Sequence, residues 1–188
     1  MKKMMIASAL TGLLMMPLAN AADYIVDTRG AHASVNFKIK HLGYSWLTGR
    51  FDKFDGKFNY DSANPEASEI TFNVDVTSLN SNHAERDKHL KNDEVLGASK
   101  HATATFTSTS VKDMGNGNLK IVGNMTLKGV TKPMTIDAEK IGEGKDPWGG
   151  YRVGFSGTTL LSLADFGVQI FGDSSHATLD IQIEGIRQ

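Results

Sequence analysis

The 188-residue chain contains no cysteine and only four prolines. The absence of cysteine excludes disulfide frameworks, thiolate nucleophiles and iron–sulfur clusters. The chain also lacks a strong charge of either sign, because its 20 lysines and arginines nearly balance its 21 aspartates and glutamates. Nucleic-acid-binding proteins normally carry a basic stripe, so we expect no nucleic acid as a partner. The length suits one domain, and 40% hydrophobic residues can supply its core.

No apolar run reaches the roughly 20 residues that a membrane-spanning helix needs, and we predict no membrane span. The N-terminus instead begins with Lys2 and Lys3, continues with a short apolar run and reaches the small residues Ala19 and Ala21. This order is typical of a secretory signal peptide. We therefore expect cleavage after Ala21, which removes residues 1–21 and leaves residues 22–188 as one domain in a bacterial periplasm.

Apolar and polar residues alternate through most of the chain beyond this segment. Every second residue is apolar within residues 35–39, 70–76, 134–136, 151–155 and 179–183. This period of two is typical of antiparallel strands that have one dry face. The phase of the alternation changes within residues 46–60, which predicts a bulge or a sharp bend, with Gly49 as its candidate. The glycines and asparagines of residues 113–118 predict a hairpin turn.

Residues 82–96 break the alternation, because they combine poor strand formers with dense charge. They predict one helix that Asn82 caps, with Glu85 closing a capping box and Gly97 ending the helix. The narrow apolar stripe of this helix predicts that it lies across an end or an edge of the sheet. The fold class is therefore all-β, a single antiparallel barrel or sandwich of about eight to ten strands with one helical excursion. This pattern leaves open whether the interior is packed or hollow.

The sequence lacks the motifs of common catalytic and metal sites. It has no G-x-S-x-G nucleophile elbow. His83 and His89 are six residues apart, whereas the helix of a zinc protease places two histidines four residues apart. We therefore predict no metal and no catalytic residue. On a helix, His83 and Asp87 lie one turn apart and are close enough to form a hydrogen bond.

Several motifs, spread in order along the chain, resemble the YceI family in its enterobacterial form. The most specific pair is residues 86–90 (RDKHL) with residues 129–133 (GVTKP). The other matching segments are residues 32–37, 41–46, 82–85, 104–110, 123–128 and 165–166. The resemblance implies a periplasmic, lipocalin-like, extended antiparallel barrel of about eight strands. Members of this family hold a long isoprenoid or similar lipid in an apolar tunnel, and no catalytic activity is firmly attached to them.

The dry strand faces then give the side chains that we expect to line such a tunnel. They are Val35, Phe37, Ile39, Phe72, Val74, Ala104, Phe106, Ile121, Gly123, Met125, Phe155 and Ile181. We expect Trp46, Arg86 and His89 at the mouth, where they could meet a polar head group. Alternatively, Arg86 forms a salt bridge with Asp87, Glu85 or Asp93.

The leading hypothesis is a non-enzymatic protein that carries, stores or scavenges a long apolar molecule, an isoprenoid, a quinone or a precursor of one. No cofactor is expected apart from such a bound lipid, and the lipid would be exchanged transiently with a membrane or a membrane protein. Two alternatives remain from the sequence. One is an enzyme that acts on a bound lipid or quinone through His89, Asp87 or His83, and the other is a solidly packed barrel that docks a stress-related partner. No feature of the sequence assigns an oligomeric state.

Overall fold

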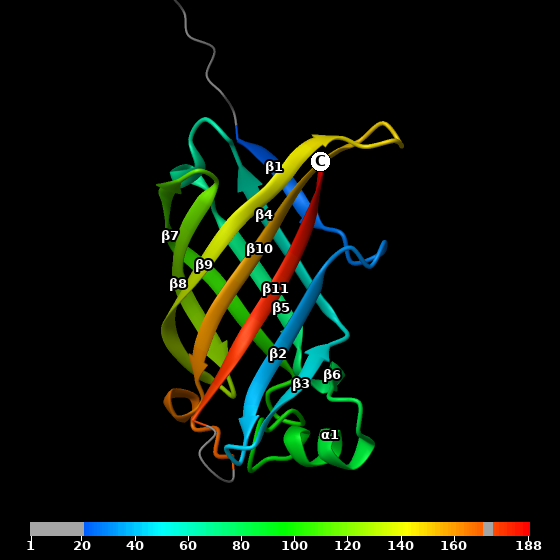
Figure 1. Ribbon diagram of the computed structural model, residues 1–188, viewed down its shortest axis with the longest axis vertical. Helices are drawn as coiled ribbons and strands as arrows, with labels where there is room; N and C mark the ends of the chain where they lie inside the picture. The colour runs from blue at the N-terminus through cyan, green and yellow to red at the C-terminus, as the bar shows by residue number, and fades with distance from the viewer. Residues whose placement is uncertain (1–20, 171–174) are drawn as a thin grey trace, which may run out of the picture.

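The protein is an antiparallel barrel with a single α-helix across one end, as the computed structural model shows for residues 21–170 and 175–188 (Figure 1). Apart from Ala21, the predicted signal peptide lies outside these described residues. The strands are β1 (Ala22–Val26), β2 (Ser34–His41), β3 (Ser45–Phe51), β4 (Phe54–Tyr60), β5 (Ile70–Asp75), β6 (Leu79–Asn80), β7 (Thr103–Gly115), β8 (Asn118–Leu127), β9 (Val130–Lys145), β10 (Tyr151–Ser162) and β11 (His176–Arg187). The helix is α1 (Ala84–Lys91), and three short 3₁₀ turns are η1 (Pro65–Ala67), η2 (Val76–Ser78) and η3 (Ala164–Phe166).

Eight strands close the barrel in the order β1-β4-β5-β7-β8-β9-β10-β11, with β11 pairing back onto β1. The closing pair is short and joins residues 24–26 of β1 to residues 185–187 of β11. Farther along the same edge of β11, residues 177–182 pair with β2, and β3 and β6 follow β2. The all-β class and the extended barrel of about eight strands are therefore confirmed. Of the helices that the structure describes, none is both long enough and apolar enough to cross a bilayer.

Two local predictions can be compared directly with the strands. The hairpin at residues 113–118 is confirmed, because Asn116 (φ 54°) and Gly117 (φ 83°) form the two-residue turn between β7 and β8. The phase change within residues 46–60 comes from a bend at Asp52 and Lys53, which separates two strands with different partners. β3 pairs with β2 and β6, whereas β4 pairs with β1 and β5. Gly49 is wrong as the site of the bend and lies within β3.

The helix lies across one end of the barrel, as expected, but it is shorter than predicted (Figure 1). His83, rather than Asn82, caps its N-terminus, and the His83 side chain accepts a hydrogen bond from the Arg86 N–H (3.2 Å). Asn82 instead adopts a left-handed backbone (φ 62°). The helix stops at Asn92 because the Asn92 side chain accepts the N–H of Val95, a local bond that competes with another helical turn.

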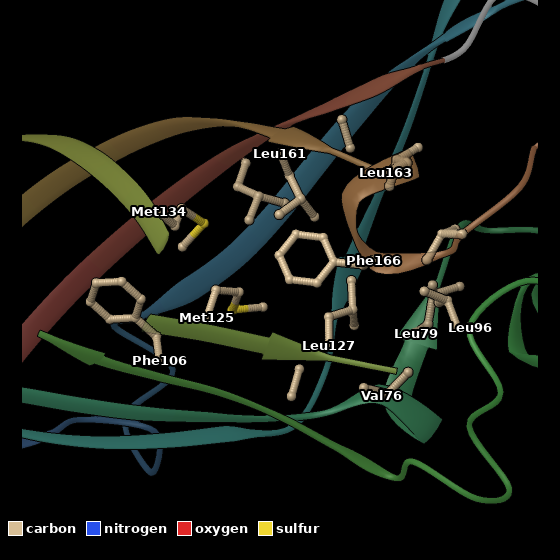
Figure 2. Packing of buried hydrophobic residues seen from close by; sticks show 14 of the residues in the cluster. Val76, Leu79, Leu96, Phe106, Met125, Leu127, Met134, Leu161, Leu163 and Phe166 are labelled. Atoms are coloured by element: carbon tan, nitrogen blue, oxygen red, sulfur yellow. The ribbon is translucent and has the colours of Figure 1, made fainter. Parts of the chain in front are cut away.

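The buried apolar residues form two clusters at different heights of the barrel. The larger cluster lies toward α1, where Leu127, Leu161 and Phe166 point toward one another from β8, β10 and η3 (Figure 2). The smaller cluster lies toward the opposite end and contains Tyr24, Tyr60, Val111, Leu119, Ala138 and Val153. We call the end of the barrel near α1 the helix end and the opposite end the far end.

Candidate ligand-binding cavity

A cavity of about 310 Å³ opens at the helix end of the barrel. Its volume falls within the range of small-molecule sites, roughly 300–1,000 Å³. Strands β2, β3, β7, β8, β10 and β11 supply most of its wall, and α1 with the segments that flank it covers one side. The wall consists of aliphatic and aromatic side chains, apart from four basic residues, Lys40, His41, Arg86 and His89.

Two smaller cavities lie beyond this one toward the far end. The middle cavity, about 120 Å³, shares Val35, Val74, Ala104, Met125 and Leu179 with the wide one. The innermost cavity, about 90 Å³, shares part of its wall with the middle one. The residues common to the middle and innermost cavities are Ile70, Phe72, Ile121, Phe155 and Ile183. The volume of free space therefore decreases stepwise along the barrel, an arrangement that suits a long and thin apolar molecule.

Aromatic rings close the far end of this space. Tyr24 and Phe58 stack with their ring centroids 5.2 Å apart. Phe155 meets the edges of Phe58 and Tyr60 at 5.8 and 5.1 Å. Burial raises the pKa of both Tyr24 and Tyr60, as expected for phenols in an apolar surrounding. The interior is thus packed at one end and hollow at the other.

The structure brings eleven of the twelve predicted tunnel residues to the walls of these cavities. Val35, Phe37, Ile39, Val74, Ala104 and Met125 line the wide cavity, and Phe72, Phe106, Ile121, Phe155 and Ile181 line the smaller ones. Gly123 is buried but is not among the lining residues. A Cβ atom on Gly123 would overlap the Phe106 ring and the Thr107 carbonyl, because both already lie over it.

The sequence-based prediction missed other lining residues, and only some of them had a detectable signal. Leu127, Leu161 and Leu179 are in phase with Met125, Phe155 and Ile181, so extending the alternation would have found them. Other missed lining residues come from turns and loops rather than from alternating strands. These are Leu42, Val95, Leu96, Leu163, Val168 and Ile170.

Arg86 and His89 both line the mouth of the wide cavity, where they were expected. In the described part of the chain, Arg86 forms no ion pair with Glu85, Asp87 or Asp93, because its guanidinium is held by Ser81. Its Nε donates to Ser81 Oγ (2.8 Å), and its Nη2 donates to the Ser81 carbonyl (2.5 Å). The carboxylate of Asp87 accepts from the Ser81 N–H (2.8 Å) and hydroxyl (2.5 Å) rather than from His83.

Trp46 lies on the outer face of β3 and does not line the wide cavity or the two smaller ones. Its ring is exposed, and the Nζ atom of Lys38 lies 5.3 Å from the ring centroid. Its neighbour Leu47 points inward and lines the wide cavity, as the alternation of side chains along a strand requires. Trp46 is therefore close to the mouth in the sequence but on the outer side of the wall.

Toward the far end, one group of described residues brings three metal-ligating atoms close together, and it consists of Asp27, His32 and Glu184. The His32 Nδ1 atom lies 3.1 Å from Asp27 Oδ2. A cation is already present in this cluster, because Arg152 Nη1 donates to Asp27 Oδ2 (2.6 Å) and to Glu184 Oε1 (2.5 Å). We therefore interpret this cluster as an ion-pair network that joins the β1–β2 connection to β10 and β11.

Comparisons with known proteins agree with this architecture. A model of the YceI-like domain matches residues 24–185. A UPF0312 protein of Vibrio cholerae serotype O1 is 56% identical over 189 residues, which cover 100% of both chains. The crystal structure of a Campylobacter jejuni YCEI protein has a TM-score of 0.73 at 29% identity, and the match covers 80% of this chain and 91% of that one.

A polyisoprenoid binding domain from Saccharophagus degradans, implicated in plant cell wall breakdown, has a TM-score of 0.62. The match covers 90% of this chain and 100% of that domain. At 16% identity, this likeness establishes a shared fold. The family match extends over nearly the whole described barrel and includes the strands that line the cavities. The chain therefore belongs to the family of YceI-like domains.

Proposed function

We propose that this chain is a non-catalytic protein of the bacterial periplasm that holds one long isoprenoid or similar lipid chain. Quinones and their precursors are included in this ligand class, and the role is that of a carrier, store or scavenger. The observation that carries the proposal is the series of three largely apolar cavities along the barrel, whose volumes are about 310, 120 and 90 Å³. The polyisoprenoid-binding name of the Saccharophagus degradans domain supports the same ligand class.

The hydrophobic effect is sufficient for such binding without a specific polar contact. Each buried methylene contributes about 0.8 kcal/mol, so that a dozen carbons contribute about 10 kcal/mol. Association and chain ordering cost about 4 kcal/mol or more, so that a dozen carbons leave about 6 kcal/mol or less, an affinity between micromolar and millimolar. A longer prenyl chain that also fills the inner cavities would bind more tightly and would remain bound during purification.

The positions of the polar residues support a binding role rather than catalysis. The basic residues that line the wide cavity lie at its mouth, and the middle cavity is lined by apolar residues apart from Thr105 and Gly157. The innermost cavity adds Lys57, Asn59 and Ser68 to its apolar lining. At the helix, Asp87 is engaged by Ser81 and His83 caps the first turn. Arg86 and His89 can contact a polar head group at the mouth, while the predicted signal peptide supports export to the periplasm.

The first test is chemical extraction. Protein purified from a bacterial periplasm is extracted with organic solvent, and the extract is examined by mass spectrometry. We expect a lipid with a long unbranched or prenyl chain in near-stoichiometric amount, and stripped protein should take up an added prenyl quinone. An extract without lipid, together with no uptake of the added quinone, would overturn the proposal.

The second test uses a matched pair of variants on β7. Ala104 lies on the shared wall of the wide and middle cavities, so that Ala104→Phe should fill the passage and reduce quinone affinity at least tenfold. Thr107→Phe places the same side chain on the exposed face of the strand and should bind as the parent does. Circular dichroism checks the folding of both, and Ala104→Leu replaces Ala104→Phe if the larger side chain prevents folding. Unchanged binding by a folded Ala104 variant contradicts the proposal.

A further inference from the structure

The hairpin between β2 and β3 presents exposed apolar side chains beside the cavity mouth. Tyr44 is 87% exposed, Trp46 is 58% exposed, and Leu42 is also exposed. The three residues lie within five positions at the helix end, where β2 turns into β3 (Figure 1). Tyrosine and tryptophan, with an apolar ring and one polar group, are enriched at the boundary between membrane and water. We call residues 42–46 the hairpin tip.

The backbone of the hairpin tip holds an apolar residue in an unfavourable conformation. Leu42 has a φ of 49° and Gly43 a φ of 79°, and the Tyr44 N–H donates to the His41 carbonyl (2.9 Å) to close the turn. Such turns favour Asn or Gly at the position of Leu42, because a left-handed backbone crowds a larger side chain. Strained conformations of this kind concentrate at functional sites. The strained backbone at Leu42 therefore supports a functional role for the apolar side chain at this position.

The two charged side chains that line the wide cavity, Lys40 and Arg86, are both basic. The described residues that line the wide cavity include Lys40, His41, Arg86 and His89 but no carboxylate. Lys38 lies against the Trp46 ring, on the outer side of the same hairpin. The mouth thus offers basic groups next to exposed apolar ones, which is the combination that binds anionic lipid surfaces.

We infer that the helix end docks on a lipid bilayer with anionic head groups, and that the hairpin tip enters the head-group region. The same Leu42 side chain borders the wide cavity, so that docking brings the cavity mouth to the head-group region of the bilayer. A long apolar ligand could then enter or leave the barrel without passing through bulk water. The inference rests on the proposed function for this last step only, because the docking itself depends on the hairpin tip and on the basic residues that line the cavity mouth.

The two tryptophans of the chain allow a direct test, because they lie at opposite ends of the barrel. Trp46 belongs to the hairpin tip, whereas Trp148, 75% exposed, lies in the turn between β9 and β10 at the far end (Figure 1). Trp148→Phe leaves only the Trp46 signal, and Trp46→Phe leaves only the Trp148 signal. Both proteins are mixed with vesicles of phosphatidylethanolamine and phosphatidylglycerol that contain a brominated lipid. We expect the vesicles to quench Trp46 at least threefold more than Trp148, and equal quenching would overturn the orientation.

A second measurement separates docking from folding. Leu42→Asn removes the apolar side chain and inserts a residue that tolerates the left-handed backbone, so that thermal stability should stay equal or rise. The double variant Leu42→Asn, Tyr44→Ser should nevertheless lower partitioning onto the anionic vesicles at least tenfold. Ile141→Ser, at an exposed position on β9, is the matched control and should partition as the parent does. If the double variant partitions as the parent does, or if the parent binds phosphatidylcholine vesicles equally well, the inference is wrong.

The Ala104→Phe variant distinguishes the failure of docking from the failure of lipid binding. Its hairpin tip is intact, so we expect it to partition onto anionic vesicles as the parent does while failing to take up a prenyl quinone. Parent protein that carries a lipid but does not bind anionic vesicles overturns the docking alone, and the tip would then be assigned to a protein partner. Parent protein that docks but neither carries nor takes up lipid overturns the proposed function alone.

Discussion

The two ends of the barrel are built from the same alternating strands but differ in almost every other respect. At the helix end, the interior contains a cavity of about 310 Å³ with basic groups at its mouth. At the far end, Tyr24, Phe58, Tyr60 and Phe155 pack their rings against one another, and the remaining cavity is about 90 Å³. The difference shows that alternation produces a barrel wall, whereas the sizes of the inward side chains decide whether the barrel is filled.

The pairing of strands adds to this difference. At the far end, β1 pairs directly with β11 and completes the ring of eight strands. Toward the helix end, β2 takes the place of β1 on β11 and leads outward into β3 and β6. The connection between β1 and β2 passes the ion-pair network, where Asp27 accepts hydrogen bonds from Arg152 Nη1 (2.6 Å) and the Gly30 N–H (2.8 Å). We expect the far end to contribute most to stability and the helix end to contribute most to binding.

The largest effect on stability should come from Arg152→Met. Asp27 is only 4% exposed, and Arg152 also bonds Asp146 Oδ2 (2.9 Å), so the variant leaves buried carboxylates without their cation. Breaking a buried pair by removing one partner costs about 3–5 kcal/mol. The free energy of unfolding, measured with urea and circular dichroism, should fall by this amount. The variant that remains folded should bind lipid as the parent does.

Arg50→Met is the matched control for this prediction. Arg50 forms an equally short ion pair with Asp52 (2.6 Å), but both side chains are largely exposed to water. Exposed pairs contribute about 0–1 kcal/mol, so the control should unfold almost as the parent does. Equal losses of unfolding free energy for the two variants would show that the ion-pair network does not stabilise the far end.

An intermediate loss of stability is expected for Val→Ala at two buried positions, one in the packed far end and one beside the cavity. Val153 on β10 is fully buried in the far-end cluster, whereas Val35 on β2 is also buried but borders the wide and middle cavities. Val153→Ala should cost about 2–3 kcal/mol, and Val35→Ala about 1 kcal/mol, because a side chain beside a void has fewer contacts to lose. Urea unfolding of lipid-free protein measures both values.

The lipid-bound protein serves as an internal check on this contrast. A bound prenyl chain would supply the contacts that Val35 lacks in the empty barrel, so saturation with prenyl quinone should enlarge the cost of Val35→Ala. The cost of Val153→Ala should not change with ligand. Equal costs for the two substitutions in empty protein would contradict the contrast between a packed and a hollow end.

Much of the wall, but not its closure, could be predicted from the sequence. Val35, Phe37 and Ile39 were placed correctly on the inner face, because strand geometry fixes the direction of every second side chain. The choice between a closed barrel and a sandwich depends on the pairing of β1 with β11, which joins residues at opposite ends of the chain. Local periodicity carries no information on such a pair, and the family resemblance supplied it.

For the candidate site, the lining residues on alternating strands could be predicted from the sequence, whereas those in turns and loops could not. Gly123 was placed in the tunnel because it is in phase with Met125, but the Phe106 ring covers it from a neighbouring strand. Val168 and Leu163 line the cavity from a turn and a loop, where no period of two exists to identify them. Helix capping was missed for a related reason, because His83 and Asn82 are both able to cap and the choice depends on how the preceding backbone leaves β6.

The last expected effect concerns acid, and it acts at the far end. The hydrogen bond from Arg152 holds the pKa of Asp27 well below its ordinary value of 3.8, and the Gly150 N–H, followed by Arg152, lowers the pKa of Asp146. Groups with a lowered pKa stabilise the folded state above their ordinary pKa, and this stabilisation is lost as the pH falls, because the unfolded chain takes up protons first. Stability should therefore be nearly constant from pH 7 to about 5 and decrease below about pH 4.

Asp27→Asn isolates the contribution of one carboxylate to this profile. The difference in unfolding free energy between the parent and Asp27→Asn should be largest near neutral pH and should shrink as the pH drops below 3.8, the ordinary pKa. In the Arg152→Met background, the sign should reverse, because Asp27→Asn then removes a buried charge that has lost its arginine partner and restores part of the lost stability. Urea unfolding at pH 7, 5 and 3 measures all four proteins. If Asp27→Asn destabilises the parent and the Arg152→Met variant equally, the two side chains are not coupled, and the far end owes its stability to its aromatic packing alone.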